Sequence, residues 1–125
     1  MKTSRDPRHK VRQNAVRALF AESFIEQGKK NQKIKKIISN LAKIDSVIND
    51  IAPEFPIEKI NRVDLAILRL GVYEILIDKT QPKKVIIDEA IELAKEFGGE
   101  HSAGFINGAL GKLIKDISKY EHTKV

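Results

Sequence analysis

The chain contains no cysteine, which excludes disulfide bonds and cysteine-ligated zinc sites and fits a reducing, cytoplasmic setting. It also lacks any uncharged apolar run near the roughly 18 residues that a membrane-spanning helix needs. The first residues are polar and basic, without the apolar centre of a secretory signal. These absences predict a cytoplasmic protein without a membrane segment.

Patterns that carry catalysis or metal binding are also missing. The chain has three histidines, which share no metal-ligand spacing: His9, His101 and His122. Ser102 follows His101 directly, at a helix start, where a serine acts as a cap rather than as a nucleophile. Three glycines lie within one helical pattern and are expected to allow close helix packing: Gly104, Gly108 and Gly111. We expect no enzyme activity, no metal and no cofactor.

What the chain does have is an excess of positive charge. It has 125 residues, enough for one domain, with a formal net charge of +6 at pH 7 and a pI near 9.6. Such a charge favours polyanionic partners, most simply nucleic acid, but it also keeps a protein soluble. From charge alone, the two interpretations are equally good.

The segment Asn61–Asp78 is expected to be the central helix of the fold. Its sequence is apolar on every side of a helical wheel, so other helices must cover it all round. Asn61 can cap its start, and Asp64 lies near the positive end of its dipole. Arg69 and Glu74 cannot pair with each other along one face, and each is expected to meet a partner on another helix.

Four further helices are predicted around this segment, with one short turn at Pro56–Ile60. They run from Asp6-Pro7 to Gly28, from Asn31 to Ile51, from Pro82 to Phe97, and from Ser102 to about Tyr120. The class is therefore all-α, a compact single domain of about five to six helices. The expected organisation is a flexible basic arm (1–5), one helical domain (6–120) and a tail (121–125).

Most of the net charge lies before residue 18. Arg5, Arg8 and Arg12 are spaced by three and four residues, which places them on one face of the first helix. A helix dipole disfavours cations at the amino end, and a bound phosphate would relieve that conflict. We expect RNA contact here; the alternative is a frayed, solvated helix end.

Three ordered motifs follow the basic first helix, RHKVRQNAVRALF (8–20). They are VDLAILRLGVYEIL (63–76), VIIDEAIELAKEFG (85–98) and FINGALGKL (105–113). Together they resemble the NusB family of transcription antitermination factors, over nearly the whole chain. The resemblance implies two packed helical bundles and binding of the single-stranded boxA element of ribosomal RNA leaders. It also implies a heterodimer with NusE, a small-subunit ribosomal protein, that helps RNA polymerase resist termination and supports rRNA maturation.

The resemblance also assigns roles by position. It gives RNA contact to six residues: Arg8, His9, Lys10, Arg12, His101 and Phe105. The helical spacing described above adds Arg5 to this set. It places Phe20 and Asp64 at the NusE interface. The alternative function is a helical protein-interaction module without specific RNA binding. Whether the free protein is a monomer or a homodimer is left open.

Overall fold

The computed structural model describes residues 6–121, and this part of the chain is helical without a strand. The elements are α1 (Pro7–Glu22), α2 (Gln32–Ser39), α3 (Leu41–Ile51), the 3₁₀ turn η1 (Ile57–Lys59), α4 (Arg62–Tyr73), the π-helical segment η2 (Glu74–Asp78), α5 (Lys83–Phe97), α6 (Ser102–Lys115) and α7 (Ile117–Glu121). The all-α prediction is confirmed, with more helices than expected. The basic arm (1–5) and residues 122–125 of the tail lie outside the described residues.

α4 and η2 form the central rod that the segment Asn61–Asp78 predicted. The side-chain oxygen of Asn61 accepts the N–H groups of Val63 and Asp64 at 2.8 and 3.3 Å, so the expected cap is present. Apolar side chains are buried around the whole rod, and Leu68 is 0% exposed. Because α1, α3, α5 and α6 all pack against α4, its apolar surface is covered from several directions.

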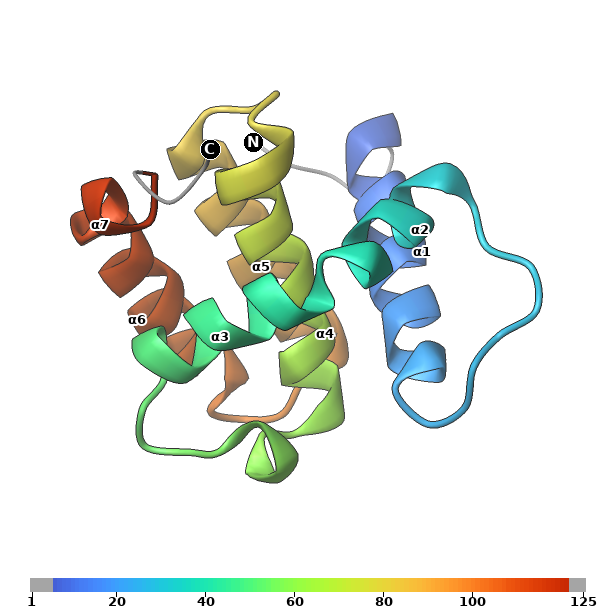
Figure 1. The fold of residues 1–125 in the computed structure, drawn as a ribbon, viewed down its shortest axis with the longest axis horizontal. Helices are drawn as coiled ribbons and strands as arrows, with labels where there is room; N and C mark the ends of the chain where they lie inside the picture. Colours follow the sequence, from blue (N-terminus) through green and yellow to red (C-terminus); the bar gives the residue numbers. More distant parts are fainter. Residues whose placement is uncertain (1–5, 122–125) are drawn as a thin grey trace.

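The helices stand in two groups around α4 (Figure 1). α1 and α2 lie together on one side, while α3, α6 and α7 lie on the other, with α5 behind α4. The contacts agree, since α5 packs most extensively on α6, α3 packs on α6, and α1 packs on α2. This arrangement agrees with the two packed bundles that the family resemblance implies.

The first helix ends six residues earlier than Gly28, at Glu22. The Ser23 hydroxyl donates a hydrogen bond to the Phe20 carbonyl oxygen at 2.6 Å, which ends the helix by competing for a backbone acceptor. Residues 23–31 then form a wide loop to α2 (Figure 1).

The single helix predicted for Asn31–Ile51 is in fact two helices that meet at Asn40. The backbone of Asn40 leaves the helical region, at φ −110° and ψ 13°. Its side-chain amide donates to the Lys36 carbonyl oxygen at 2.8 Å, which satisfies one of the free acceptors at the end of α2. The break explains part of the difference in helix number.

The turn between α5 and α6 also differs from its prediction. Ser102 is the first residue of α6 rather than its cap, and its hydroxyl oxygen accepts the Gly99 N–H at 2.9 Å. Gly98 ends α5 as predicted; a Cβ there would lie 2.5 Å from the Ser102 hydroxyl oxygen. Glycine is required at this position because the two helices turn so tightly.

Close helix packing depends on a glycine that the sequence did not single out. A Cβ on Gly71 of α4 would lie 3.0 Å from a methyl group of Leu110 in α6. The three glycines expected to serve this purpose have nothing within 4 Å of the point that a Cβ would occupy: Gly104, Gly108 and Gly111. That expectation was wrong, because these glycines do not lie on the packed side of α6.

Arg69 and Glu74 meet partners on other helices, as expected. The Arg69 guanidinium donates two hydrogen bonds to the Asp45 carboxylate of α3, at 3.0 and 2.9 Å. The Glu74 carboxylate, in η2, accepts from Arg12 Nε of α1 at 3.0 Å and from Lys33 Nζ of α2 at 2.9 Å. Glu74 therefore joins the central rod to the α1–α2 pair.

Candidate functional site

α1 begins with a cationic turn that an acidic cap holds in place. The Asp6 carboxylate accepts the Arg8 N–H at 2.9 Å, and this hydrogen bond is the main reason that the pKa of Asp6 is lowered. Arg8 and Lys10 are exposed. Arg8 also lines two hollows of about 390 and 130 Å³ between α1 and the loop after η2. The turn therefore presents two cations near a helix amino end, where anions are favoured.

His9 and Arg12 point the other way, into the protein, with 2% and 5% of their surface exposed. His9 Nδ1 lies 2.8 Å from Glu89 Oε1, and His9 Nε2 lies 2.9 Å from Glu96 Oε2. The Arg12 guanidinium lies 3.0 Å from the Glu74 carboxylate and 3.5 Å from the Glu89 carboxylate. Both side chains therefore belong to a buried ionic network that links α1 to η2 and α5.

This geometry corrects the expectation that Arg5, Arg8 and Arg12 share one exposed cationic face. Arg12 is turned inward because buried carboxylates hold it, and Arg5 lies outside the described residues. A sequence signal for this existed. Arg12 precedes the buried Ala15 and Val16 by three and four residues, so it lies on the buried stripe of α1.

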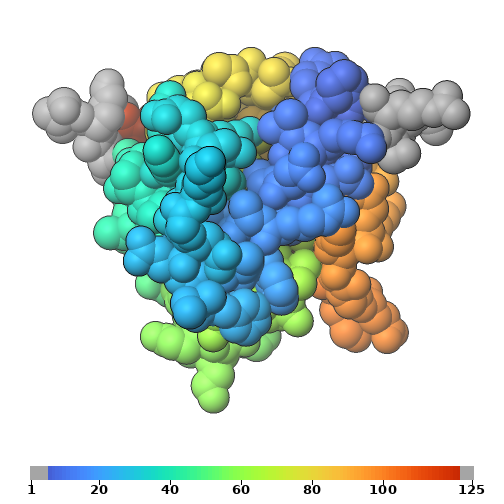
Figure 2. Space-filling model, turned by 90° about the vertical axis from the view of Figure 1, so that its right-hand side faces the viewer, coloured from blue at the N-terminus to red at the C-terminus, as the bar shows by residue number. Residues whose placement is uncertain are grey.

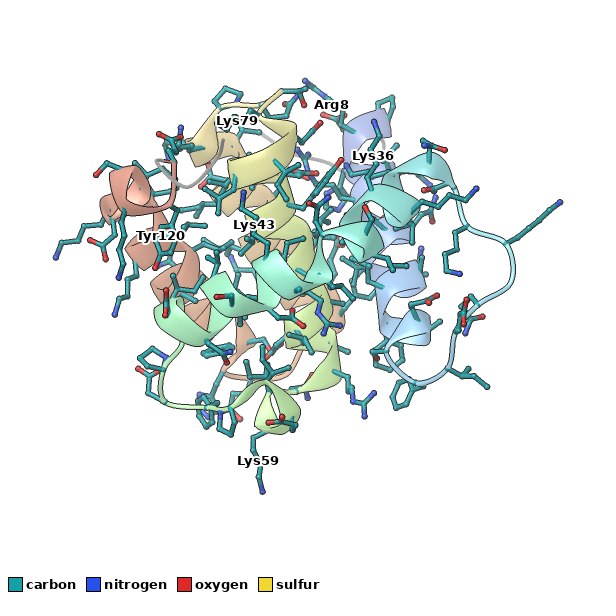
Figure 3. The ribbon with its side chains drawn as sticks, viewed as in Figure 1. Arg8, Lys36, Lys43, Lys59, Lys79 and Tyr120 are labelled. Carbon is teal, nitrogen blue, oxygen red and sulfur yellow. The ribbon has the colours of Figure 1, made fainter. Side chains whose placement is uncertain are left out.

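The remaining residues that the resemblance assigns to RNA lie in a pocket elsewhere on the molecule. His101 and Phe105 line a cavity of about 410 Å³ at the α5–α6 turn. Phe55 forms another wall, with its ring centroid 5.9 Å from that of Phe105 and the ring planes at 84°. Lys59 also lines this pocket. In Figure 3, Lys59 lies at the opposite end of the molecule from Arg8. The assigned RNA residues therefore form two groups.

Asp64 lines the same pocket as Phe105. It is 8% exposed, and its Oδ1 atom is buried without a hydrogen bond from any residue of the described range 6–121. A buried carboxylate oxygen without a donor is costly. The Asp64 carboxylate therefore lies in the wall of the pocket, largely shielded from solvent.

Phe20 is half-buried near the end of α1, where its ring meets Phe24 edge to face at 5.0 Å. The Arg62 guanidinium lies 4.5 Å above the Phe24 ring and donates to the Ser23 carbonyl oxygen. This contact ties the end of α1 to the start of α4, so Phe20 and Asp64 lie at the same end of the molecule. Figure 2 shows α1 open to solvent on this face, between α2 with its preceding loop and α5.

Some site residues could not be found by reading motifs. Phe55 lies in the loop between α3 and η1, and only the fold brings it to Phe105. Glu89 and Glu96 lie seven residues apart on α5, a spacing that puts both on one helix face. That spacing is a weak signal, and the partners His9 and Arg12 come from the other end of the chain.

The described part of the chain holds no group of three or more His, Cys, Asp or Glu residues arranged to hold a metal ion. Within residues 6–121, no helix is long and apolar enough to cross a membrane.

The comparison with known proteins decides the family. A family model described as the NusB family matches residues 9–115. The chain belongs to the NusB family. A relative from Campylobacter lari, transcription antitermination protein NusB, is 39% identical over 129 residues, covering 88% of this chain and 97% of the relative. Another, from Clostridium botulinum strain Loch Maree, is 49% identical over 81 residues, covering 65% of this chain and 57% of the relative.

Solved NusB structures share the fold. T. maritima NusB superposes with a TM-score of 0.77 at 33% identity, covering 93% of this chain and 94% of that chain. A structure described as antitermination factors NusB and NusE in complex with dsRNA gives 0.75 at 21% identity, covering 86% and 96%, and shows the fold alone. As a NusB family member, the chain is a transcription antitermination factor and not an enzyme.

Proposed function

We propose that this chain binds the single-stranded boxA-type RNA of ribosomal RNA leaders together with NusE, and so supports rRNA transcription and maturation. One observation carries the proposal: the chain pairs an exposed cationic helix start, Arg8 and Lys10, with an aromatic pocket that holds Phe105. Single-stranded RNA is recognised by these two means, phosphate contacts and stacking on aromatic rings. The structure that shares this fold is described as NusB and NusE in complex with dsRNA, which is consistent with NusE and RNA as partners; the preference for a single strand rests on the aromatic pocket.

The two groups of RNA residues have different roles, phosphate contact and base stacking. Arg8 and Lys10 hold backbone phosphates at the start of α1, where the dipole of the helix adds to their charge. Phe105 stacks on an unpaired base at the pocket, and Phe55 braces its ring from the side. His101, exposed at the mouth of the same pocket, adds a polar contact.

The NusE contact is assigned to the end of the molecule that carries Phe20 and Asp64. Asp64 would contribute a negative charge at this end of the molecule toward a basic partner. The exposed Phe24 ring, 60% accessible, would extend the apolar contact that begins at Phe20. Association with RNA polymerase through this complex, a cytoplasmic location and a homodimer of the free protein stay predictions.

Two substitutions should separate phosphate contact from stacking. Arg8→Ala removes one phosphate contact, so the slope of log affinity against log salt should flatten by about 0.7. Phe105→Ala should weaken binding by about 1–3 kcal/mol with the slope unchanged, because stacking releases no counterions. Fluorescence anisotropy with labelled boxA-type RNA over a salt series measures both.

Lys43→Ala is the matched control for this experiment. Lys43 is an exposed cation on α3, away from Arg8 and from the pocket residue Lys59 (Figure 3). Its loss should leave affinity and slope nearly unchanged. If Arg8→Ala and Phe105→Ala bind RNA like the parent, RNA is bound elsewhere on the molecule. If the parent itself does not bind this RNA, the protein-interaction module becomes the better interpretation.

NusE binding should depend on Phe20 and Asp64. Asp64→Lys places a like charge against a basic partner, and Asp64→Asn removes the carboxylate charge with little change of shape. Each variant, and Phe20→Ala, should weaken NusE binding at least about tenfold in calorimetry. Asp88→Asn, a partly exposed acid on α5, is the control and should bind normally. Unchanged affinity of the Phe20 and Asp64 variants would place NusE on another surface.

A further inference from the structure

Both ring nitrogens of the buried His9 face a carboxylate. Nδ1 lies 2.8 Å from Glu89 Oε1, and Nε2 lies 2.9 and 3.1 Å from the two oxygens of Glu96. A neutral imidazole donates from one nitrogen only, so its other lone pair would face a carboxylate oxygen. Only the imidazolium ion donates to both, and the geometry therefore calls for a protonated His9.

Among the described residues, the ion pairs around His9 form one connected network. The network joins three cations to three carboxylates across α1, α2, η2 and α5: His9, Arg12 and Lys33 with Glu74, Glu89 and Glu96. The amide of Gln13 also donates to Glu96, at 3.1 Å. Loss of the His9 proton would leave the lone pair of one ring nitrogen facing a carboxylate oxygen in a site with little access to water, which is unfavourable.

His9 is placed to control the start of α1. α1 packs closely on α4, whereas it reaches α5 through long side chains: His9 to Glu89 and Glu96, and Arg17 to the ring of Phe97 at 5.1 Å. Figure 2 shows α5 beside α1 on the open face. The direct neighbours of His9 in sequence are the exposed cations Arg8 and Lys10.

We propose that protonated His9 is a positioning residue for RNA binding, which ties the first turn of α1 to α5 and so fixes the direction in which Arg8 and Lys10 present their charges. The inference rests on the proposed RNA binding and adds that RNA affinity depends on whether His9 is protonated. The residue itself touches no RNA.

The same surroundings set the pH at which this proton is lost. Burial lowers the pKa of His9, but the hydrogen bonds that His9 donates to Glu89 and Glu96 outweigh it, so the pKa is raised above its ordinary value of 6.5. A raised pKa in the folded state means that the stabilising charge is fully present below pH 6.5 and is lost as pH rises through the higher folded value. RNA affinity should fall in that window.

The test is RNA affinity against pH at fixed ionic strength, from about pH 6 to about pH 9. Anisotropy of a short labelled boxA-type single-stranded RNA gives the affinity, and circular dichroism shows that each variant is folded. The parent should lose about threefold to tenfold in affinity as pH rises, because fewer molecules hold the binding-competent turn. Glu96→Gln should shift the midpoint to lower pH, since one of the two groups that raise the pKa is gone. His9→Gln should show no such transition.

Two controls make the result specific. His122→Gln should keep both the affinity and the transition of the parent, whereas His101→Gln should lower affinity at every pH, through its lost RNA contact, without moving the midpoint. Glu96 is one-third exposed, and glutamine keeps its shape, so this variant should fold even if His9→Gln does not. A role of His9 in stability alone would change the melting temperature without moving the midpoint of the RNA profile.

The outcomes separate this inference from the proposed function. RNA binding by the parent without a pH transition overturns the inference alone. So does an unshifted midpoint in Glu96→Gln, or a full transition in His9→Gln. A parent that binds no boxA-type RNA at any pH overturns the proposed function, and the inference falls with it.

Discussion

Glu74→Ala should destabilise the protein by about 3–5 kcal/mol, the cost of breaking a buried ion pair from one side. Glu74 is 2% exposed, and its carboxylate accepts from Arg12 and Lys33 at 3.0 and 2.9 Å. Without it, the buried Arg12 guanidinium would lose its closest partner. Lys33, which is more exposed, could turn toward water.

Urea unfolding followed by circular dichroism measures this loss. Asp45→Ala is the comparison, because the Asp45–Arg69 pair is only partly buried and its loss should cost less than that of the more deeply buried Glu74. A double-mutant cycle with Arg12→Ala should show that the two losses are not additive, since both remove the same pair. If Glu74→Ala costs no more than Asp45→Ala, Glu74 does not hold α1 and α2 to the rod.

Leu68→Ala should cost about 2–5 kcal/mol, through lost burial and the cavity left behind. Leu68 is 0% exposed at the centre of α4, where surrounding helices limit any collapse into the space. Ile25→Ala removes a similar apolar side chain that is 71% exposed, and it should change stability by less than about 0.5 kcal/mol. Urea unfolding compares the two. A Leu68→Ala loss below about 0.5 kcal/mol would contradict the central-rod account.

The central rod could be predicted because its sequence carries a complete signal. The apolar residues surround the helical wheel, Asn61 supplies the cap, and Arg69 and Glu74 demand partners elsewhere. These local properties hold whatever the neighbouring helices are. The identity of the partners, Asp45, Arg12 and Lys33, depends on the fold and could not be predicted.

Helix ends were predicted less well, since single polar side chains decide them. The hydroxyl of Ser23 ends α1 before Gly28, and the amide of Asn40 divides one expected helix into two. Both residues are also tolerated inside helices, so the sequence pattern alone does not show which hydrogen bond their side chains make.

The cations of α1 were the main misinterpretation at the candidate site. Helical spacing predicted that Arg12 shares a face with Arg5 and Arg8, and the family resemblance assigned His9 to RNA, whereas both side chains lie on the buried stripe of α1. The pattern could have indicated this, but the carboxylates that make burial acceptable come from α5 and η2, far along the chain. Phe105 and His101 were placed by family resemblance, and only the structure added Phe55 to their pocket.

The most direct test of the account is competition for RNA with and without NusE. Labelled boxA-type single-stranded RNA is bound to the protein and displaced by unlabelled boxA RNA, a scrambled strand or a duplex. The account predicts that boxA RNA displaces the probe best. It also predicts that NusE raises RNA affinity and that RNA raises NusE affinity by the same factor. Equal displacement by the scrambled strand or the duplex, or an RNA affinity that NusE leaves unchanged, would contradict it.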